Sequence, residues 1–167
     1  MSPQADPYPL ALSIRQPWAT LILLGLKTVE IRRWTTPIRG RVSIHAGKIA
    51  DKRSEGWSHV PPEHFEITRR RAGLVGAADL VDCISYRSKR DFSRDYQLHF
   101  SPPAWYLPPC LFGFRFECPA IVTFRAISGQ VKFFCVGAQP MANARAVRSN
   151  EVIGRGMRPK KSVTFEV

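Results

Sequence analysis

The apolar residues of this chain come in short segments that glycine, proline and charged residues interrupt. Even Leu21–Leu24, the longest purely aliphatic run, is far shorter than the about 20 residues that a membrane-spanning helix needs. Elsewhere apolar and polar residues alternate with a period of two, as in half-buried strands. Several short strands with a few short helices and long polar insertions favour a mixed β/α fold. We predict a small closed β-barrel with short flanking helices.

The alternation and the breaker residues together place the expected elements along the chain. A short buried helix is expected at 18–24, with Trp18 in the core, and a second helix is expected to begin at Pro61–Pro62 and to end at Arg69–Arg71. Residues 86–100 are charged and irregular, and the four prolines of 101–110 predict an extended loop. Strands are expected at 10–14, 28–34, 41–46, 73–84, 112–117, 121–127 and 131–136.

The charge of the chain is strongly basic. Its 167 residues include 25 Lys+Arg and 13 Asp+Glu, a formal net charge of +12, which attracts polyanions and nucleic acid above all. Residues 137–167 hold six of the basic and two of the acidic side chains, so most of the excess precedes them. We predict an N-terminal extension at 1–9, one domain at 10–136 and a flexible basic tail at 137–167. The tail either aids solubility alone or adds phosphate contacts.

The cysteines and the N-terminal residues exclude several other classes of protein. Cys83, Cys110, Cys118 and Cys135 form no C-x-x-C pair and lie near no histidine at zinc-ligand spacing. They are interpreted as reduced, packed thiols, and no metal or other cofactor is expected. Residues 1–9 lack a basic segment followed by an apolar one, so no secretory signal is expected. An intracellular, cytoplasmic location without membrane association follows as a prediction.

Three blocks, in order along the chain, carry a resemblance to a known family. The first is LSIRQPWATLILLGLKTVEIRRW with RGRVSIHAG, the second is GLVGAADLVDC, and the third is FGFRFECPAIVTFRAISGQVKFFCV. Over roughly residues 10–136 the chain resembles the ASCH domain family of the PUA-like superfamily, and its K-T-x-E form is similar to the coactivator-homology branch. The resemblance implies a PUA-like barrel with a groove beside the first helix. Members are thought to bind RNA or DNA there, and some are hydrolases of RNA or modified nucleosides.

Lys27, Glu30 and Arg32 are the residues of the first block best suited to chemistry. Lys27 follows the expected end of the helix, and Glu30 and Arg32 share one strand face with Thr28. Lys27 can contact a phosphate or, with a lowered pKa, act as a base, while Glu30 can orient it or bond the edge of a nucleobase. Arg32 can bind a phosphate through two parallel hydrogen bonds or stack on a base. A surface ion-pair ladder is the alternative, and the resemblance favours function for Lys27 and Glu30 above all.

The hydrolase branch of the family is matched only in part. Its members resembling acetylated-cytidine amidohydrolases use a K-T-x-T element, in which the lysine and the second threonine are catalytic. Lys27 matches the lysine, but Glu30 stands where the second threonine is expected. A carboxylate cannot replace a hydroxyl nucleophile without a change of mechanism.

Five further residues complete the predicted nucleic-acid contacts: Gln16, Trp34, His45, Trp105 and Tyr106. Gln16 lies at the helix entrance, where backbone N–H groups favour an anion, and Trp34 ends a strand. His45 matches a histidine of the family signature and is either a satisfied core residue or a ligand contact. Trp105 and Tyr106 belong to the proline-rich loop, where they either stack on bases or cover the domain.

Three functional hypotheses follow. The first is binding of nucleic acid, RNA favoured over DNA, through the groove beside the first helix. The second is a hydrolase, either a ribonuclease or a nucleoside amidohydrolase, with Lys27 and Glu30 as catalytic residues. The third is a protein-interaction module in transcription or translation regulation, with the basic tail as the arm that binds the partner.

Overall fold

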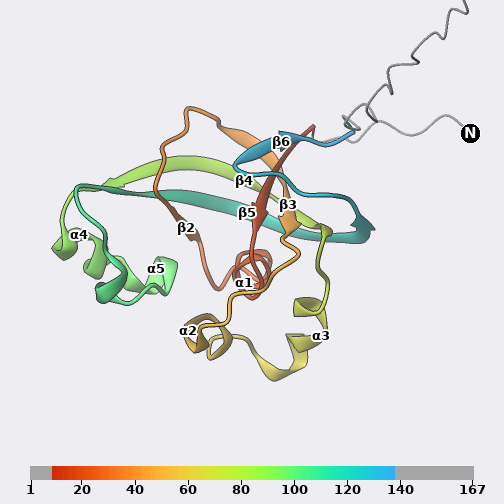
Figure 1. Cartoon of the computed structure of the whole chain (residues 1–167), viewed down its shortest axis with the longest axis horizontal. Coiled ribbons are helices and arrows are strands. Elements are labelled where there is room, and N and C mark those ends of the chain that lie inside the picture. Colours follow the sequence, from red (N-terminus) through yellow and green to blue (C-terminus); the bar gives the residue numbers. More distant parts are fainter. Residues whose placement is uncertain (1–8, 138–167) are drawn as a thin grey trace, which may run out of the picture.

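The computed structural model describes residues 9–137, which form a curved mixed sheet with short helices around it (Figure 1). The sheet order is β2-β5-β4-β3-β1-β6. Neighbouring strands are antiparallel except β1 and β3, which are parallel. The extension and the basic tail predicted at 1–9 and 137–167 lie outside the described residues but for one residue each. The strands are β1 (Leu10–Ile14), β2 (Val29–Arg32), β3 (Gly40–Ala46), β4 (Gly73–Tyr86), β5 (Leu111–Ala126) and β6 (Phe133–Cys135).

The prediction of a closed barrel is not confirmed. Within the described residues β2 and β6 are the two edges of the sheet, and no ladder joins them. Side chains bridge this opening instead of backbone hydrogen bonds. Arg32 Nη2 at the end of β2 donates to the Ser13 carbonyl of β1 at 2.8 Å, and the Trp34 and Phe133 rings pack edge to face at 5.6 Å. The fold is therefore a mixed sheet whose edges approach without pairing.

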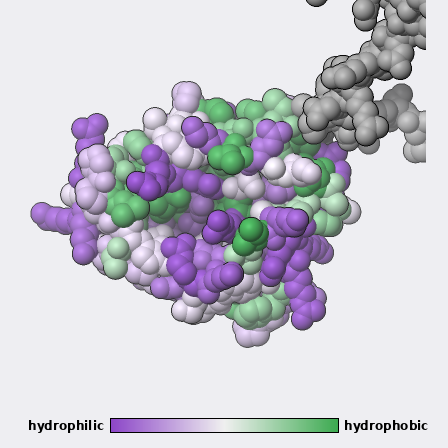
Figure 2. All heavy atoms as spheres, in the orientation of Figure 1, coloured by the Kyte–Doolittle hydropathy of each residue, from purple (hydrophilic) through white to green (hydrophobic). Residues whose placement is uncertain are grey.

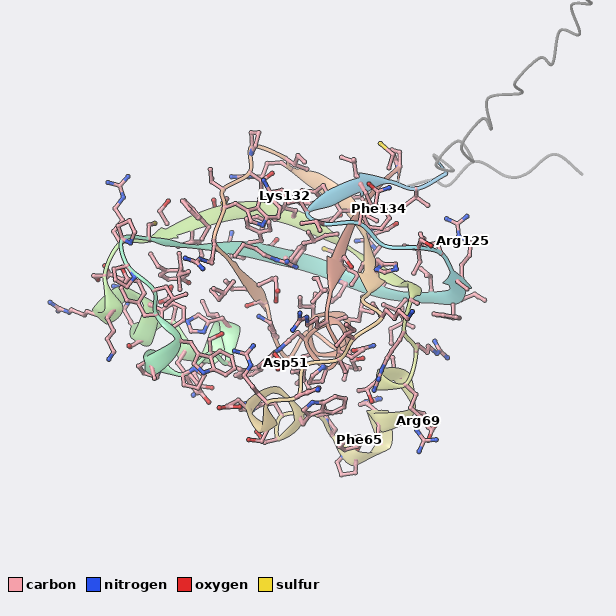
Figure 3. All side chains as sticks on the ribbon, viewed as in Figure 1. Asp51, Phe65, Arg69, Arg125, Lys132 and Phe134 are labelled. Carbon is pink, nitrogen blue, oxygen red and sulfur yellow. The ribbon has the colours of Figure 1, made fainter. Side chains whose placement is uncertain are left out.

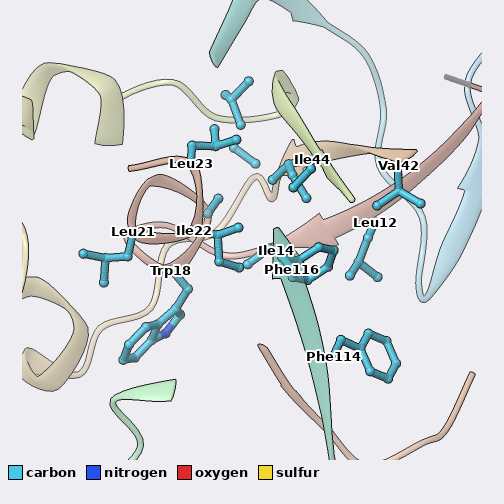
Figure 4. Packing of buried hydrophobic residues seen from close by; sticks show 14 of the residues in the cluster. Leu12, Ile14, Trp18, Leu21, Ile22, Leu23, Val42, Ile44, Phe114 and Phe116 are labelled. Atoms are coloured by element: carbon cyan, nitrogen blue, oxygen red, sulfur yellow. The ribbon is translucent and has the colours of Figure 1, made fainter. Parts of the chain in front are cut away.

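Helix α1 (Trp18–Leu23) is buried along its whole length, as its apolar composition predicts. Its side chains pack with those of β1, β3 and β5 in the main core, which Figure 4 shows around Ile14, Ile44 and Phe116. The chain leaves the helix through Gly25, whose φ of +71° suits a residue without a side chain. This exit directs Lys27 and the start of β2 towards the open side of the sheet.

Strand β5 is continuous where the sequence predicts two strands with a break at the proline. Cys118 takes a positive φ of 48°, and the pairing of β5 with β4 shifts register between Ala77 and Asp79. Pro119 therefore sits in a bulge rather than in a turn, because a bulge leaves an extra residue outside the ladder and needs no N–H from it.

The polar segments fold into short helices more often than predicted. Residues 86–100, expected to be irregular, form α4 (Lys89–Arg94) and α5 (Tyr96–His99). The hydroxyl of Ser88 caps α4 by accepting from the Asp91 N–H, and Phe92 anchors it in the core. Over the described residues no helix has the length and apolarity to cross a membrane. The other helices are α2 (Ser54–Trp57), η1 (Pro62–His64), α3 (Phe65–Thr68) and η2 (Pro103–Trp105).

Candidate functional site

A cleft of about 760 Å³ opens beside β2, between the loop after β3 and the loop before β5. Asp51 and Lys132 lie on its lining and are labelled below and above β2 in Figure 3. Hydrophilic side chains crowd the face of the molecule shown in Figure 2, with hydrophobic ones between them. The lining includes three tryptophans, two carboxylates and seven basic side chains: Trp18, Trp34, Trp105, Glu30, Asp51, Arg15, Lys27, Arg32, Arg33, Lys48, Arg53 and Lys132.

Lys27 forms the floor of the cleft and is only 2% exposed. Its ammonium donates to the carbonyls of Val29 and His99 and pairs with Glu30 Oε2 at 3.1 Å. These three acceptors match the three protons of a charged lysine. Burial lowers the pKa of Lys27, and the neighbouring Glu30 carboxylate opposes that shift. The ammonium also lies 5.4 Å from the centre of the Trp18 ring.

Glu30 links Lys27 to Arg32. Its second oxygen, Oε1, lies 3.4 Å from Arg32 Nη2, so two cations share one carboxylate. Arg32 Nη2 also donates to Ser13, while Arg32 Nε is buried with no hydrogen-bond partner among the described residues. The three residues that the sequence singled out therefore form one ion-paired row at the start of and along β2, and its two ends differ in exposure.

A second charged group, formed by Asp51 and Arg53, lines the cleft beside α1. Asp51 is 5% exposed and accepts from Trp18 Nε1 at 2.8 Å and from Arg53 Nη2 at 2.6 Å. The bonds from Arg53, more than any other contact, hold the pKa of the Asp51 carboxyl well below its usual range. The Arg53 guanidinium in turn lies 3.6 Å from the centre of the Trp105 ring, and Trp105 packs edge to face with Trp18.

Of the predicted nucleic-acid contacts, the cleft brings together Lys27, Glu30, Arg32, Trp34 and Trp105. Trp34 is half-buried, packs on Phe114 and Phe133, and has Lys132 above its ring at 5.6 Å.

Gln16, His45 and Tyr106 do not line this cleft. Gln16 is fully buried: its amide oxygen accepts from the N–H and the hydroxyl of Thr20, and its amide nitrogen donates to the carbonyls of residues 67 and 70. His45 bonds Ser13 and the Ile127 carbonyl through its two ring nitrogens. Tyr106 packs with Phe92, and its hydroxyl donates to Pro109. Their hydrogen bonds within the fold leave these three outside the site.

Asp51, Arg53 and the basic residues around the mouth of the cleft were not identified in the sequence. Asp51 and Arg53 belong to a polar segment to which the sequence assigns no function, and their partners Trp18 and Trp105 lie far away along the chain. A D-x-R pattern that begins four residues after the RVSIHAG block is the one local signal that could have indicated the pair. Over residues 9–137 no group of three His, Cys, Asp or Glu is placed to hold a metal ion.

Comparison with known proteins identifies the family of the domain that holds this cleft. The family model described as the ASCH domain matches residues 12–138. The chain belongs to the ASCH domain family. Activating signal cointegrator 1 of Homo sapiens is 34% identical to it over 90 residues, which are 48% of this chain and 15% of that protein. The Mus musculus protein of the same name is 36% identical over 84 residues, 46% of this chain and 14% of its own length.

A solved structure supports the fold of this ASCH domain. The crystal structure of ASCH from Zymomonas mobilis superposes with a TM-score of 0.55 at 16% sequence identity, and covers 78% of this chain and 89% of that one. The likeness shows that the two share a fold. The match spans about 15% of the length of the two cointegrators.

Proposed function

We propose that this ASCH domain binds single-stranded nucleic acid, with RNA favoured over DNA, in the cleft beside α1 and β2. One observation carries the proposal: seven basic side chains and three tryptophans line a single cleft that holds only two carboxylates. Cations attract the phosphates, and aromatic rings stack with the bases, whatever the sequence. The cleft volume of about 760 Å³ lies in the range of ligand-binding pockets.

The depth of the aromatic rings favours a single strand over a duplex. Trp18 is nearly buried and Trp105 half-buried within the lining, whereas the bases of a duplex stay stacked on one another. An unpaired base can leave the stack and enter such a cleft. The association of ASCH domains with RNA binding favours RNA as the strand.

The contacts of Lys27 support binding rather than hydrolysis. Its nitrogen is held by Val29, His99 and Glu30, so it is turned to acceptors of the protein rather than to a substrate. Both oxygens of Glu30 are paired with cations of the protein, which leaves neither oxygen turned to a substrate. A catalytic pair needs one member free to accept or donate a proton at the substrate.

The protein-interaction hypothesis remains a prediction. The matched relatives are named signal cointegrators, which suits a role in transcription, but the match spans about 15% of their length. The tail that would hold the partner lies outside residues 9–137.

A binding titration tests the proposal. Fluorescence anisotropy of a labelled single-stranded RNA is measured over a series of salt concentrations, with the matching duplex as a competitor. We expect a log–log slope of about −3, since the four exposed cations at the mouth of the cleft, Arg15, Arg33, Lys48 and Lys132, would each contribute about 0.7 on a single strand. A slope near zero, or preference for the duplex, would contradict single-strand binding in this cleft.

A further inference from the structure

The cations of the cleft fall into two groups that differ in their partners. Lys27 and Arg32 share Glu30, and Arg53 pairs with Asp51 at 2.6 Å, so each interior cation has a carboxylate partner and two carboxylates offset most of the charge of three cations. Around the mouth, exposed cations have no carboxylate partner within the described residues. These rim cations are Arg15, Arg33, Lys48 and Lys132. A phosphate therefore finds more uncompensated positive charge at the rim, where no described carboxylate pairs with the four cations, than inside, where two carboxylates face three cations.

Arg53 is held in one orientation by contacts on several sides. Its Nε donates to Asp51 Oδ1 at 2.9 Å and its Nη2 to Oδ2 at 2.6 Å, a bidentate pairing. Asp51 is itself fixed by Trp18 and by the Arg53 backbone N–H. The guanidinium lies against the Trp105 ring. The side chain is nevertheless 53% exposed and belongs to the cleft lining.

Such a guanidinium is a flat, rigid surface rather than a mobile phosphate ligand. The adjacent Asp51 carboxylate repels a phosphate and already occupies two of the guanidinium nitrogens. Stacking of a base on a guanidinium plane needs neither nitrogen, because it uses the face and not the edge of the group. Trp105 covers one face, and the exposed remainder of the side chain is turned to the cleft.

We infer that Arg53, held flat on Trp105 by Asp51, is the stacking platform for one unpaired nucleobase, whose flanking phosphates lie against the rim cations. This inference rests on the proposed function and names the part of the strand that enters the cleft. Asp51 is a positioning residue in this arrangement, since it orients Arg53 and removes its net charge without contacting the base.

The test separates the contribution of the nucleobase to affinity from that of the sugar–phosphate backbone. Two short single-stranded RNA probes are compared: one is abasic at every nucleotide, and the other carries a single base at its central nucleotide. The wild-type protein should bind the one-base probe about tenfold more tightly, the size expected of one stacked base. Arg53→Lys keeps the charge but not the plane, and should abolish this difference between the two probes. Lys48→Ala, the rim control, should weaken both probes equally.

A second variant gives effects of opposite sign on the two probes. Asp51→Asn frees the Arg53 charge, so it should reduce the one-base advantage and tighten binding of the abasic probe. Thermal unfolding confirms that each variant is folded, and Arg53→Lys, at an exposed position, remains informative if Asp51→Asn is not. Equal binding of both probes by the wild type, or an advantage that survives Arg53→Lys, overturns the inference. Failure of both probes and of ordinary single-stranded RNA to bind overturns the proposed function itself.

Discussion

Replacing Glu30 with glutamine should destabilise the domain, because Glu30 is the one carboxylate that pairs with buried Lys27 in the described structure. After the change the ammonium keeps the carbonyls of Val29 and His99 but loses its counter-charge. Arg32, which shares Glu30, keeps its bond to Ser13 and is 21% exposed. The uncompensated charge therefore falls chiefly on Lys27.

The magnitude follows from the burial of that pair. Removing one partner of a buried ion pair costs about 3–5 kcal/mol. The glutamine oxygen can still accept a hydrogen bond, so we expect the low end, about 3 kcal/mol of unfolding free energy at neutral pH. For a domain of this size that loss lowers Tm by about 10 °C.

The pH dependence gives this prediction its sharpest form. Burial lowers the pKa of Lys27 in the folded protein below the ordinary 10.5, and the Glu30 carboxylate opposes the shift. Glu30→Gln should therefore lower it further. Between the folded and unfolded pKa values the unfolded chain binds more protons, so stability rises with pH across that interval. The deficit of the variant is largest at neutral pH and shrinks as pH rises towards 10.5.

Urea unfolding followed by circular dichroism, at steps from about pH 7 to about pH 10, measures this difference. Glu117→Gln is the matched control, because Glu117 pairs with Arg115 on the exposed surface and should change stability by less than about 0.5 kcal/mol. A loss for Glu30→Gln as small as that of the control, or one independent of pH, would refute the account of Lys27.

Three other predictions concern the rim, the core and a buried histidine. Arg33→Ala and Lys48→Ala should each reduce the magnitude of the salt slope for single-stranded RNA by about 0.7, as a titration against salt would record. Gly76→Ala should destabilise the fold by about 3 kcal/mol in chemical unfolding, since a Cβ there would lie 2.5 Å from the Ala120 carbonyl oxygen; wild-type stability would exclude this packing. His99 accepts from the Ser101 N–H and donates to a carbonyl as a neutral ring, and burial lowers its pKa below 6.5. Stability should therefore fall as pH drops through 6.5, and His99→Gln should weaken that dependence.

Much of the sheet could be predicted because its strands alternate and end at glycine or proline. The predicted strand at 10–14 matches β1, and the predicted helix at 18–24 matches α1 within one residue. The break expected in β5 was wrong because a bulge accommodates Pro119, and sequence alone does not separate a bulge from a turn. The barrel was not confirmed because its closure depends on pairing between edges far apart in the chain, which alternation within each strand does not specify.

The candidate site also contains some residues that the sequence could predict and some that it could not. Glu30 and Arg32 lie two residues apart, so strand periodicity could place them on a common face, and Lys27 is near them because it directly precedes the strand. Asp51 and Arg53 could not be assigned, because their role comes from Trp18 and Trp105, which the fold brings to them. Gln16 was predicted at an anion site, but the carbonyls at the end of α3 and the Thr20 N–H engage its amide. Local spacing thus predicted the row on β2 and missed the contacts made between loops.

The central claim, that the cleft binds a single strand, is tested most directly by the indole N–H resonances of the four tryptophans. Trp18, Trp34 and Trp105 line the cleft, whereas Trp57 lies outside it and donates to the Asp51 carbonyl. A titration of isotope-labelled protein with single-stranded RNA, followed by NMR, should shift the three cleft signals and leave Trp57 nearly in place. The claim would be contradicted if, at saturating RNA, the Trp57 signal moved most. It would also be contradicted if the three cleft signals stayed unchanged.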